Sequence, residues 1–552
     1  MGLGVLEDTK LPHVPGTVIL DDGVLPDSFE VTGALKHAKG KNGGHIVLNP
    51  QPSDDPNDPL NWPLWKRDCL FLIHAFGFVC TAAVPSSLLA AATEVLADTF
   101  DVSITKITQL TGFMLLAVGS SGLFVSVLAR LFGKRPQFVF ASFMCLIGTV
   151  IGASAENYNT LLAGRMIQGL GACAYESMLV AIVGDLYFVH ERGLRVAFFN
   201  FCFASLNAIG SLIAGPITTK YGWRYMFYIY IPFIGLQVLL VVFCATETSF
   251  QRNHLFETDI AADVDYDDLA RKEAGETKVV ASDDQVENSN NTATFAVPPK
   301  RTYWQYIAFY HGRQSHDNPI KLFLRPFAIC LNPAIIWINL IGSLPIASVA
   351  LSNFTTAQMY GPPPYNLNPT QLGYMFVGPL VGPLLVTALF LVASDPLALW
   401  MARRNNGVFE PEFRLPMALI VGGSLMAIGI FGWGNLYEAG DTPVVGSVIL
   451  AFYTGGMSAL NIASGAYTVD AYREVSVELV IIVMVVKNFL FFGLSYFFNN
   501  AVAARGPAFM FNIVGGIVLF GVVILGIPVY MFGKRIRGWW CRAHILKKLH
   551  LE

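Results

Sequence analysis

The residues of this chain that could do chemistry are charged side chains within long apolar segments. Arg165 lies in the apolar run 160–184, and Glu176 follows it by eleven residues. Because each helical residue turns by about 100°, eleven residues make almost three whole turns, and both side chains are predicted to share one helix face with Gln168. A charge at membrane depth costs free energy unless it meets a cavity or a partner. We therefore expect the side chains on this face to bind protons or to contact a ligand. An interhelical ion pair with no role in turnover is the alternative.

A second charged site lies in the apolar run 478–498. Lys487 and Asn488 stand about a third to halfway along this run, too deep for the lysine to reach the membrane surface easily. A fixed cation at that depth needs a counter-ion or a substrate. The expected counter-ion is Asp470 or Glu478, both near the predicted cytoplasmic edge, and contact with substrate is the alternative.

Amide side chains in other apolar runs are further candidates for a polar cavity. We expect Asn207 and Asn339 to line a polar cavity. Amides in membrane helices often serve only as hydrogen-bond partners between helices, so a purely structural role competes with this interpretation. Asn353 begins a glycosylation sequon at a predicted span end, too close to the membrane for a glycan to be expected.

Long apolar helices must position these side chains. Of the 552 residues, 54% are hydrophobic and 14% are charged, and the mean hydropathy is +0.51, whereas soluble domains carry about 25% charged residues. The composition therefore indicates a membrane protein. The near balance of 36 basic and 39 acidic residues gives no electrostatic basis for binding nucleic acid. Runs long enough to span a bilayer are predicted at 68–92, 107–130, 136–155, 160–184, 195–218, 224–245, 327–352, 370–393, 415–437, 444–468, 478–498 and 509–532.

The order of these runs predicts an all-α polytopic membrane protein, with twelve transmembrane helices in two six-helix lobes at 67–246 and 326–533. This is the layout of a secondary transporter whose central site opens alternately to the two sides, although polytopic membrane enzymes and receptors also have many helices. Lys and Arg are concentrated in alternate short loops, which places both termini and the linker in the cytoplasm. The polar parts are an N-terminal segment at 1–66, a linker at 247–325 whose composition predicts that it is largely disordered, and a basic tail at 534–552.

The sequence predicts no cofactor and no metal site. The eight cysteines stand singly, without a C-x-x-C pair, and are expected to be small buried hydrophobic residues rather than disulfides or metal ligands. Glycine-rich pieces lie inside apolar runs, and none continues into a phosphate-binding loop, so ATP-driven transport within this chain is not supported. A membrane enzyme would need a nucleophile or His/Asp cluster at one membrane face, and none is visible.

The loop after the second run carries a specific motif. From residue 128 to 136 it reads Leu-Ala-Arg-Leu-Phe-Gly-Lys-Arg-Pro, which is similar to the signature Asp-Arg-x-Gly-Arg/Lys-Arg/Lys of the major facilitator superfamily. The resemblance covers almost everything after residue 50, and within the superfamily it points to the fungal twelve-span drug:proton and polyamine:proton antiporters. Gly133, Lys134 and Arg135 match the signature. Arg130 replaces its aspartate, so the usual carboxylate gate is not expected at this loop.

Other motifs extend the same resemblance. The run Arg165-x-x-Gln168-Gly169-x-Gly171 is similar to a family motif that places an arginine in the proton-coupling region. In the fifth run, Thr219-Lys220 stands where the family's antiporter motif has a Gly-Gly pair, which weakens the export interpretation without removing it. Charges that resemble the family's inner loops, and that are predicted to gate the cytoplasmic side together with Gly133, Lys134 and Arg135, are Glu191, Arg192, Asp395, Arg403, Arg404, Glu410 and Glu412.

The resemblance implies a proton-coupled secondary transporter that works by alternating access, with export of a drug, toxin or secondary metabolite as the favoured direction. Glu176, with Asp185 and Asp470, would take up and release protons, and Arg165 would adjust the proton affinity of Glu176. We expect a monomer in the plasma membrane or in an internal membrane such as that of the vacuole. Import of a nutrient or polyamine is the nearest alternative, followed by a nutrient-sensing receptor or a membrane enzyme. The residues expected to line the substrate cavity are Gln168, Asn207, Asn339, Lys487 and Asn488.

Overall fold

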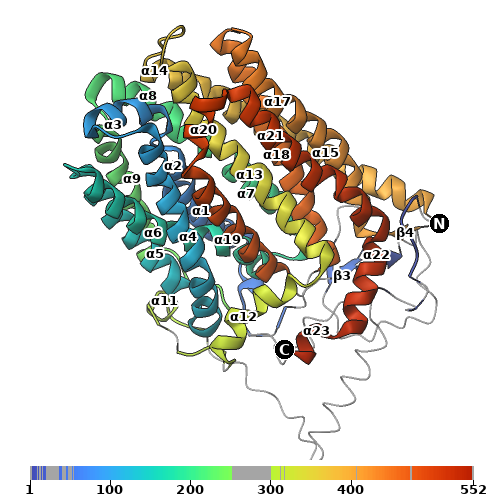
Figure 1. Cartoon of the computed structure of the whole chain (residues 1–552). Helices are drawn as coiled ribbons and strands as arrows, with labels where there is room; N and C mark the ends of the chain where they lie inside the picture. Colours follow the sequence, from blue (N-terminus) through green and yellow to red (C-terminus); the bar gives the residue numbers. More distant parts are fainter. Residues whose placement is uncertain are drawn as a thin grey trace, which may run out of the picture.

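Twelve helical segments run along a single bundle in the computed structural model (Figure 1). Each is long and apolar enough to cross a membrane, which confirms the predicted all-α fold with twelve spanning helices in two lobes. The structure describes residues 3–8, 10, 14, 16–19, 37–39, 45–47, 52–53, 55–250, 300–310, 312–315, 317–405, 407–472 and 475–549.

The first six segments form the N-terminal lobe. They are α1 (Leu64–Phe78), which continues through a π-helical turn into α2 (Val84–Ser87) and α3 (Thr93–Phe100), then α4 (Ile104–Phe132), α5 (Arg135–Ala153), α6 (Tyr158–Leu186), α7 (Val189–Ala204) with α8 (Asn207–Tyr221), and α9 (Arg224–Phe243).

The other six segments form the C-terminal lobe. They are α13 (Pro333–Tyr360), α14 (Pro369–Met375) with α15 (Val377–Arg404), α16 (Leu415–Met417) with α17 (Gly423–Glu438), α18 (Pro443–Ala471), α19 (Ser476–Ser495), and α21 (Pro507–Leu519) with α22 (Gly526–Ala543). Shorter elements outside these spans are α11 (Tyr303–Tyr306), α12 (Pro319–Ile329), α20 (Phe498–Arg505), α23 (Ile545–Lys548), β1 (Val18–Ile19), β2 (His37–Lys39), β3 (His45–Val47) and β4 (Val408–Phe409).

Local sequence explains where helices of the N-terminal lobe begin and end. The side chain of Asn157 accepts a hydrogen bond from the backbone N–H of Thr160 at 2.8 Å, which caps the start of α6. Gly133 follows the last residue of α4 with a φ of +92°, a conformation that side-chain-bearing residues rarely adopt. The chain can therefore turn sharply there, and α5 starts two residues later with Pro136 in its first turn.

Glycines allow α6 to pack closely between α4 and α5. A Cβ atom on Gly171 would lie 2.6 Å from the carbonyl oxygen of Ala141 in α5, and one on Gly169 would lie 2.3 Å from the carbonyl oxygen of Met114 in α4. Both distances are shorter than van der Waals contact, so larger residues would push the helices apart. The glycine-rich run of α6 therefore serves helix packing.

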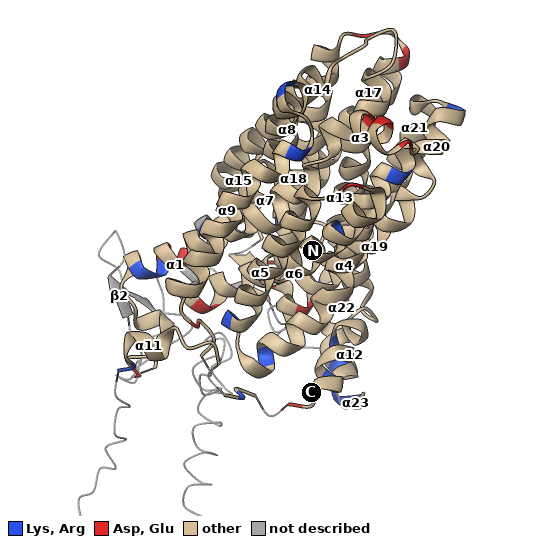
Figure 2. Ribbon diagram, turned by 90° about the vertical axis from the view of Figure 1, so that its left-hand side faces the viewer, with Lys and Arg blue, Asp and Glu red and all other residues tan. Residues whose placement is uncertain are grey.

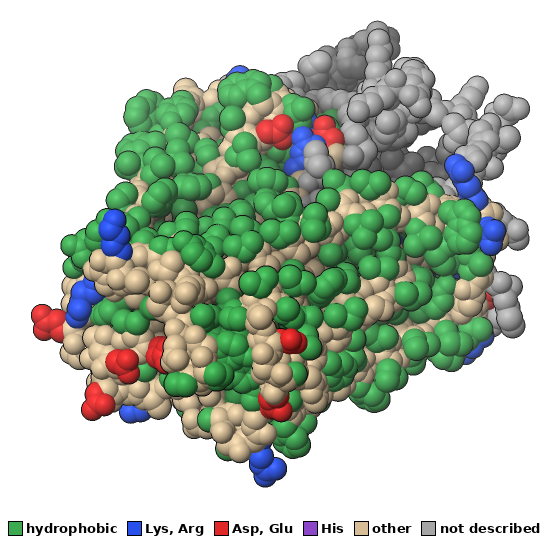
Figure 3. Space-filling model, turned by 90° about the horizontal axis from the view of Figure 1, so that it is seen from above, with side chains coloured by type: hydrophobic (Ala, Val, Ile, Leu, Met, Phe, Trp, Pro, Cys, Tyr) green, Lys and Arg blue, Asp and Glu red, His purple; other side chains and the backbone are tan. Residues whose placement is uncertain are grey.

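Charged residues are concentrated towards the two ends of the bundle (Figure 2). Seen from above, hydrophobic side chains cover much of the visible face, and charged side chains are scattered among them, in places with opposite charges side by side (Figure 3). We call the end that carries β4 and α22 the inner end and the end that carries α3 and α14 the outer end (Figure 1). The names follow the predicted cytoplasmic side.

The first described residues of the chain pack against the C-terminal lobe. β1 pairs antiparallel with β4, and the N–H of Leu6 donates to the carbonyl oxygen of Met531 at 2.9 Å. Val5 is only 2% exposed and lies in an apolar cluster with residues of α15 and with Phe413. Glu7 forms an ion pair with Lys534 at 2.6 Å.

Residues just before α1 contact the N-terminal lobe instead. The hydroxyl of Tyr306 in α11 donates to Asn57 Oδ1 at 2.8 Å, and the rings of Tyr306 and Trp62 meet edge to face with their centroids 5.8 Å apart. The backbone carbonyl of Ala308 in turn accepts a hydrogen bond from Arg135 at 2.9 Å. The polar N-terminal segment is thus attached to both lobes.

The predicted disordered linker is corrected in its last part. Residues 300–325 include α11 and most of α12, and residues 251–299 lie outside the described residues. The side chain of Asn318 caps α12 by accepting from the N–H of Ile320 at 3.0 Å. The seventh span does not start at 327, because Asn332 caps a new helix that begins at Pro333. The Asn-Pro steps at 318–319 and 332–333 each start a helix, and they separate α12 from α13 where composition alone predicts one continuous span.

Candidate functional site

A central cavity lies between the two lobes. Its volume is about 90 Å³, and its walls come from α1, α2, α4, α6, α7 and α8 of the N-terminal lobe and from α13, α15, α18 and α19 of the C-terminal lobe. Pockets that hold small organic molecules usually enclose about 300–1,000 Å³, so the cavity is narrow in this conformation. The polar residues that line it are Ser86, Glu176, Asn207, Asn353, Thr454 and Lys487.

An ion pair between Glu176 and Lys487 crosses this cavity from one lobe to the other. Each residue is 8% exposed. The ammonium group of Lys487 also donates to Asn488 Oδ1 at 2.9 Å, and the amide of Asn488 reaches Glu176 Oε2 at 3.5 Å, the outer limit for a hydrogen bond. Three of the predicted site residues therefore meet at one point, on α6 and α19.

This pairing corrects the counter-ion expected for Lys487. Asp470 instead pairs with Arg414, and Glu478 pairs with Arg130 at 3.3 Å. Both expected counter-ions are at the inner end, whereas Glu176 lies more than three hundred residues away in the chain, in the other lobe. A partner on another lobe cannot be found from helical periodicity.

Arg165 lies in a separate polar cluster inside the N-terminal lobe. Its guanidinium donates to Gln168 Oε1 at 2.9 Å, to the carbonyl oxygen of Pro85 at 2.8 Å and to Thr111 Oγ1 at 3.2 Å. Arg165 and Gln168 are fully buried and do not belong to the cavity walls. Eleven residues of helix rise by roughly 16 Å, so the shared face of α6 does not bring Arg165 into contact with Glu176.

The two candidate amides have different surroundings. Asn207 lines the cavity and accepts a hydrogen bond from Ser86 Oγ at 2.8 Å. Asn339 does not line it, because its amide donates to the carbonyl oxygen of Ile335 at 2.9 Å in its own helix. The prediction that Asn339 and Gln168 face the cavity is therefore corrected.

The turn after α4 holds a dense polar cluster at the inner end. Lys134 pairs with Asp185 near the end of α6, and Arg135 donates to the backbone carbonyls of Ala245 and Val242 at 2.8 Å each. Glu247 accepts from the N–H groups of Lys134 and Arg135 at 3.1 Å each. Sequence reasoning missed Glu247, although a carboxylate at the end of the sixth run was the available signal.

The other predicted gating residues of the N-terminal lobe are placed in part. Glu191 pairs with Arg67 at 3.0 Å, and the same guanidinium donates to the carbonyl oxygen of Leu186 at the end of α6. The side chain of Arg192 lies outside the described residues. The pair joins the start of α7 to the start of α1.

In the C-terminal lobe, the predicted loop charges are joined by ion pairs. Glu410 and Glu412 both bind Arg537 of α22, at 2.8 and 2.9 Å, and all three are at most 2% exposed. Arg414 pairs with Asp395 at 2.7 Å and with Asp470. Among described residues, Arg403 and Arg404 enter no ion pair; both are exposed, and Arg404 lies over the ring of Trp400.

The lobes also contact each other above and below the cavity. At the outer end, the hydroxyl of Thr370 donates to Thr219 Oγ1 at 2.9 Å. At the inner end, Arg130 of α4 reaches Glu478 in the first turn of α19 at 3.3 Å, and Arg325 of α12 reaches the same carboxylate at 3.4 Å. Arg130, which replaces the signature aspartate, therefore has a carboxylate partner across the lobe boundary.

Comparison with known proteins decides the family. A profile described as Major Facilitator Superfamily matches residues 74–491, which is more than half of the chain. The chain belongs to this superfamily. Its members are membrane transporters of small molecules, so this protein is a multi-pass membrane transporter, and the two-lobed bundle around a central cavity is the architecture on which that activity depends.

The superfamily relatives found are distant. Protein HOL1 of Saccharomyces cerevisiae is 25% identical, with a match over 97% of both chains. MFS transporter cpaT of Aspergillus oryzae is 24% identical over 88% of this chain and 90% of its own length. The solved proton:xylose symporter XylE has a TM-score of 0.54 over 85% of this chain at 15% identity, which supports the fold alone.

Proposed function

We propose that this superfamily member is a proton-coupled transporter that exports a small organic molecule by alternating access. The observation that carries the proposal is the ion pair between Glu176 and Lys487 across the central cavity. It places a group that can bind a proton between the two bodies that must move relative to one another. Plasma-membrane localisation and a monomeric state belong to the same proposal.

The chemistry of the pair links protonation to lobe movement. When Glu176 is ionised, its attraction to Lys487 in a largely buried site favours the conformation in which α6 and α19 meet. When Glu176 binds a proton, the attraction is lost and Lys487 is left as an uncompensated cation, which destabilises that conformation. Proton binding on one side of the membrane and release on the other would thus drive the switch between cavity openings.

Two further carboxylates occupy matching positions near the inner exit. Asp185 lies one residue before the end of α6, and Asp470 lies one residue before the end of α18. Each pairs with a basic side chain, Lys134 and Arg414 respectively. We assign them to gating or proton release at the inner end, with Arg165 as a structural support of α6 rather than a direct partner of Glu176.

Import of a nutrient or polyamine by the same coupling is the second candidate. It is favoured by Thr219 and Lys220, which stand where the antiporter motif has two glycines. The hydroxyl of Thr219 accepts a hydrogen bond from Thr370 of the other lobe, which a glycine at this position could not do. Accumulation or loss of labelled compounds in cells that overexpress the protein gives the direction.

Proton-coupled flux in proteoliposomes tests the role of Glu176. Compounds whose transport by the wild-type protein depends on a pH gradient are first found in a panel, and their flux is then measured for Glu176→Gln. We expect gradient-driven flux to be abolished while the variant remains folded. Glu156→Gln makes the same change at an exposed position near the outer end and should leave flux unchanged. Normal gradient-driven flux through Glu176→Gln would refute the assignment.

A further inference from the structure

The cavity contains one amide side chain that makes no hydrogen bond with any described residue. Asn353 of α13 lines the cavity and is 8% exposed, and its Oδ1 atom is buried without a partner. Burying an amide without hydrogen bonds costs free energy, so such a group needs an explanation. The position also shows that the glycosylation sequon beginning at Asn353 is inside the folded bundle, where no glycan can be attached.

Other asparagines in the same lobe behave differently. The amides of Asn339, Asn435 and Asn461 donate to the carbonyl oxygen four residues earlier in their own helices, at 2.7 to 2.9 Å. Asn353 makes no such bond to Val349. Its side chain therefore has both a donor and an acceptor that bond no described residue.

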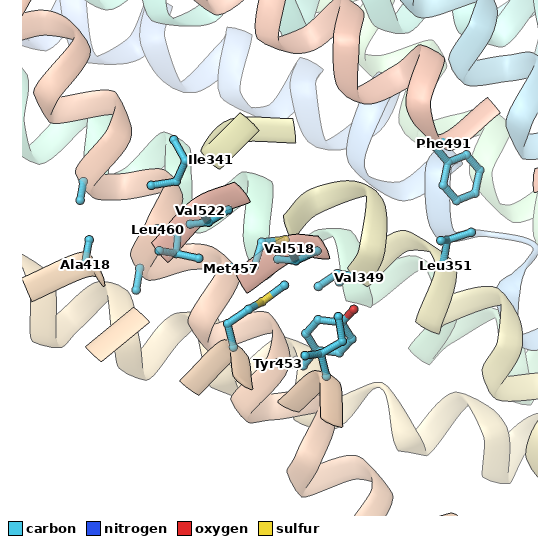
Figure 4. Packing of buried hydrophobic residues seen from close by; sticks show 14 of the residues in the cluster. Ile341, Val349, Leu351, Ala418, Tyr453, Met457, Leu460, Phe491, Val518 and Val522 are labelled. Carbon is cyan, nitrogen blue, oxygen red and sulfur yellow. The ribbon is translucent and has the colours of Figure 1, made fainter. Parts of the chain in front are cut away.

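The surroundings of Asn353 are apolar. On the same face of α13, Ile346, Val349 and Ala350 line the cavity with it. Met457 of α18 lies opposite, and Val349, Met457 and Tyr453 are grouped together in the core of the C-terminal lobe (Figure 4). A molecule that reaches Asn353 would thus contact hydrocarbon on this side of the cavity.

The charges of the cavity compensate each other. Glu176 and Lys487 are the charged residues among its lining, and they form an ion pair. Arg165 lies outside the lining, so there is no excess of positive charge to attract an anion. A neutral cargo can bind without breaking the pair, whereas an anion or cation would have to compete with one of its members.

From these observations we propose that the cargo is an uncharged, mainly apolar molecule with a hydroxyl or amide group, and that Asn353 is the residue that binds this group. The inference rests on the proposed transport function and names its substrate class. It assigns Asn353 a role in specificity, because an analogue that cannot hydrogen-bond leaves the amide unpaired.

The test is equilibrium binding to the purified protein without a pH gradient, measured by thermal shift. The probes are matched series in which one apolar body carries different end groups, for example phenylbutanol, its methyl ether, phenylbutanoate and phenylbutylamine. We expect the alcohol to bind about 2- to 10-fold more tightly than the ether, as one net hydrogen bond gives. A series in which the ether equals the alcohol, in which the acid or amine binds more tightly, or in which no alcohol binds would overturn the substrate class.

Two variants in α13 test whether Asn353 binds the polar group of the cargo. Asn353→Leu should remove the preference for the alcohol. Asn339→Leu makes the same change outside the cavity, where the amide N–H bonds the carbonyl oxygen of Ile335, and should keep the preference. Without probe, Asn353→Leu should leave the Tm unchanged or raise it by about 1–4 °C, because an unsatisfied amide is lost. A clearly lower Tm, or a preference that survives in Asn353→Leu, would show that Asn353 is structural.

The design separates this inference from the proposed coupling. Binding is measured without proton movement, so a Glu176→Gln variant that still transports would refute the coupling and leave the substrate class standing. If the wild-type protein shows no preference for the alcohol, the substrate class is refuted and the coupling is unaffected. If Asn353→Leu fails to fold, the wild-type probe series still decides the class.

Discussion

The ion pair between Glu176 and Lys487 makes a quantitative prediction about stability. Three variants are compared with the wild type: Glu176→Gln, Lys487→Met and the double variant. Because each residue is 8% exposed, a single substitution leaves an unpaired charge in a nearly dry site. Removing one partner of such a pair costs about 3–5 kcal/mol, while replacing both is close to neutral.

Asn488 sets the magnitude at the lower end of that range. Its side chain bonds Lys487 at 2.9 Å and reaches Glu176 at 3.5 Å, so it can still solvate whichever charge remains. We therefore expect each single variant to lose about 3 kcal/mol and the double variant to lose about 0–1 kcal/mol. The double variant should be more stable than either single one.

Reversible unfolding in mixed micelles provides the measurement. A double-mutant cycle on Arg195 and Asp68 is the matched control, because that pair lies within one lobe and its side chains are 18% and 39% exposed. Its coupling should not exceed about 1 kcal/mol. If the losses of Glu176→Gln and Lys487→Met simply add in the double variant, within about 0.5 kcal/mol, the pair does not hold the lobes together and the reasoning fails.

Three more outcomes are expected. Arg130→Glu should loosen the inner contact between the lobes, seen as a longer spin-label distance there, and adding Glu478→Arg should restore it; a distance unchanged by the single variant would count against that contact. Gly171→Ala should lower stability by about 1–3 kcal/mol because its Cβ meets the backbone of α5. Gly235→Ala, with open space around it, should be neutral or stabilising by up to about 1 kcal/mol, and equal thermal shifts for the two would contradict the packing argument. Val5→Asp should speed hydrogen exchange in residues 3–8, and unchanged exchange would mean that the burial of Val5 does not hold this segment.

Helical periodicity did not predict the contacts of the polar and charged residues in α6. It placed Arg165, Gln168 and Glu176 on one face of α6, yet a rise of 1.5 Å per residue puts the first and last about three turns apart. Arg165 consequently bonds to Gln168 in the lobe interior, while Glu176 meets Lys487 of the other lobe. Which helix lies opposite a given face depends on the packing of the whole bundle, and no spacing within one segment encodes it.

Helix boundaries were limited by a different cause. Hydropathy merges the end of α12 with the seventh span, because Phe327, Ala328 and Ile329 are as apolar as the span itself. The break is set by Asn332 and Pro333, whose local hydrogen bonding starts a new helix. Asn353 was passed over for a related reason: only the structure reveals that its amide lacks the usual bond to its own helix.

Because the N-terminal segment is attached to both lobes, its first residues are fixed to the lobe that comes second in the chain. Val18 and Ile19 pair with the C-terminal lobe, and Asn57 and Trp62 contact the N-terminal lobe. The two attachments are separated in the chain by the 32 residues between Ile19 and Pro52. A probe attached near Val5 would therefore report the movement of the second half of the transporter, although it precedes the first helix of the first half.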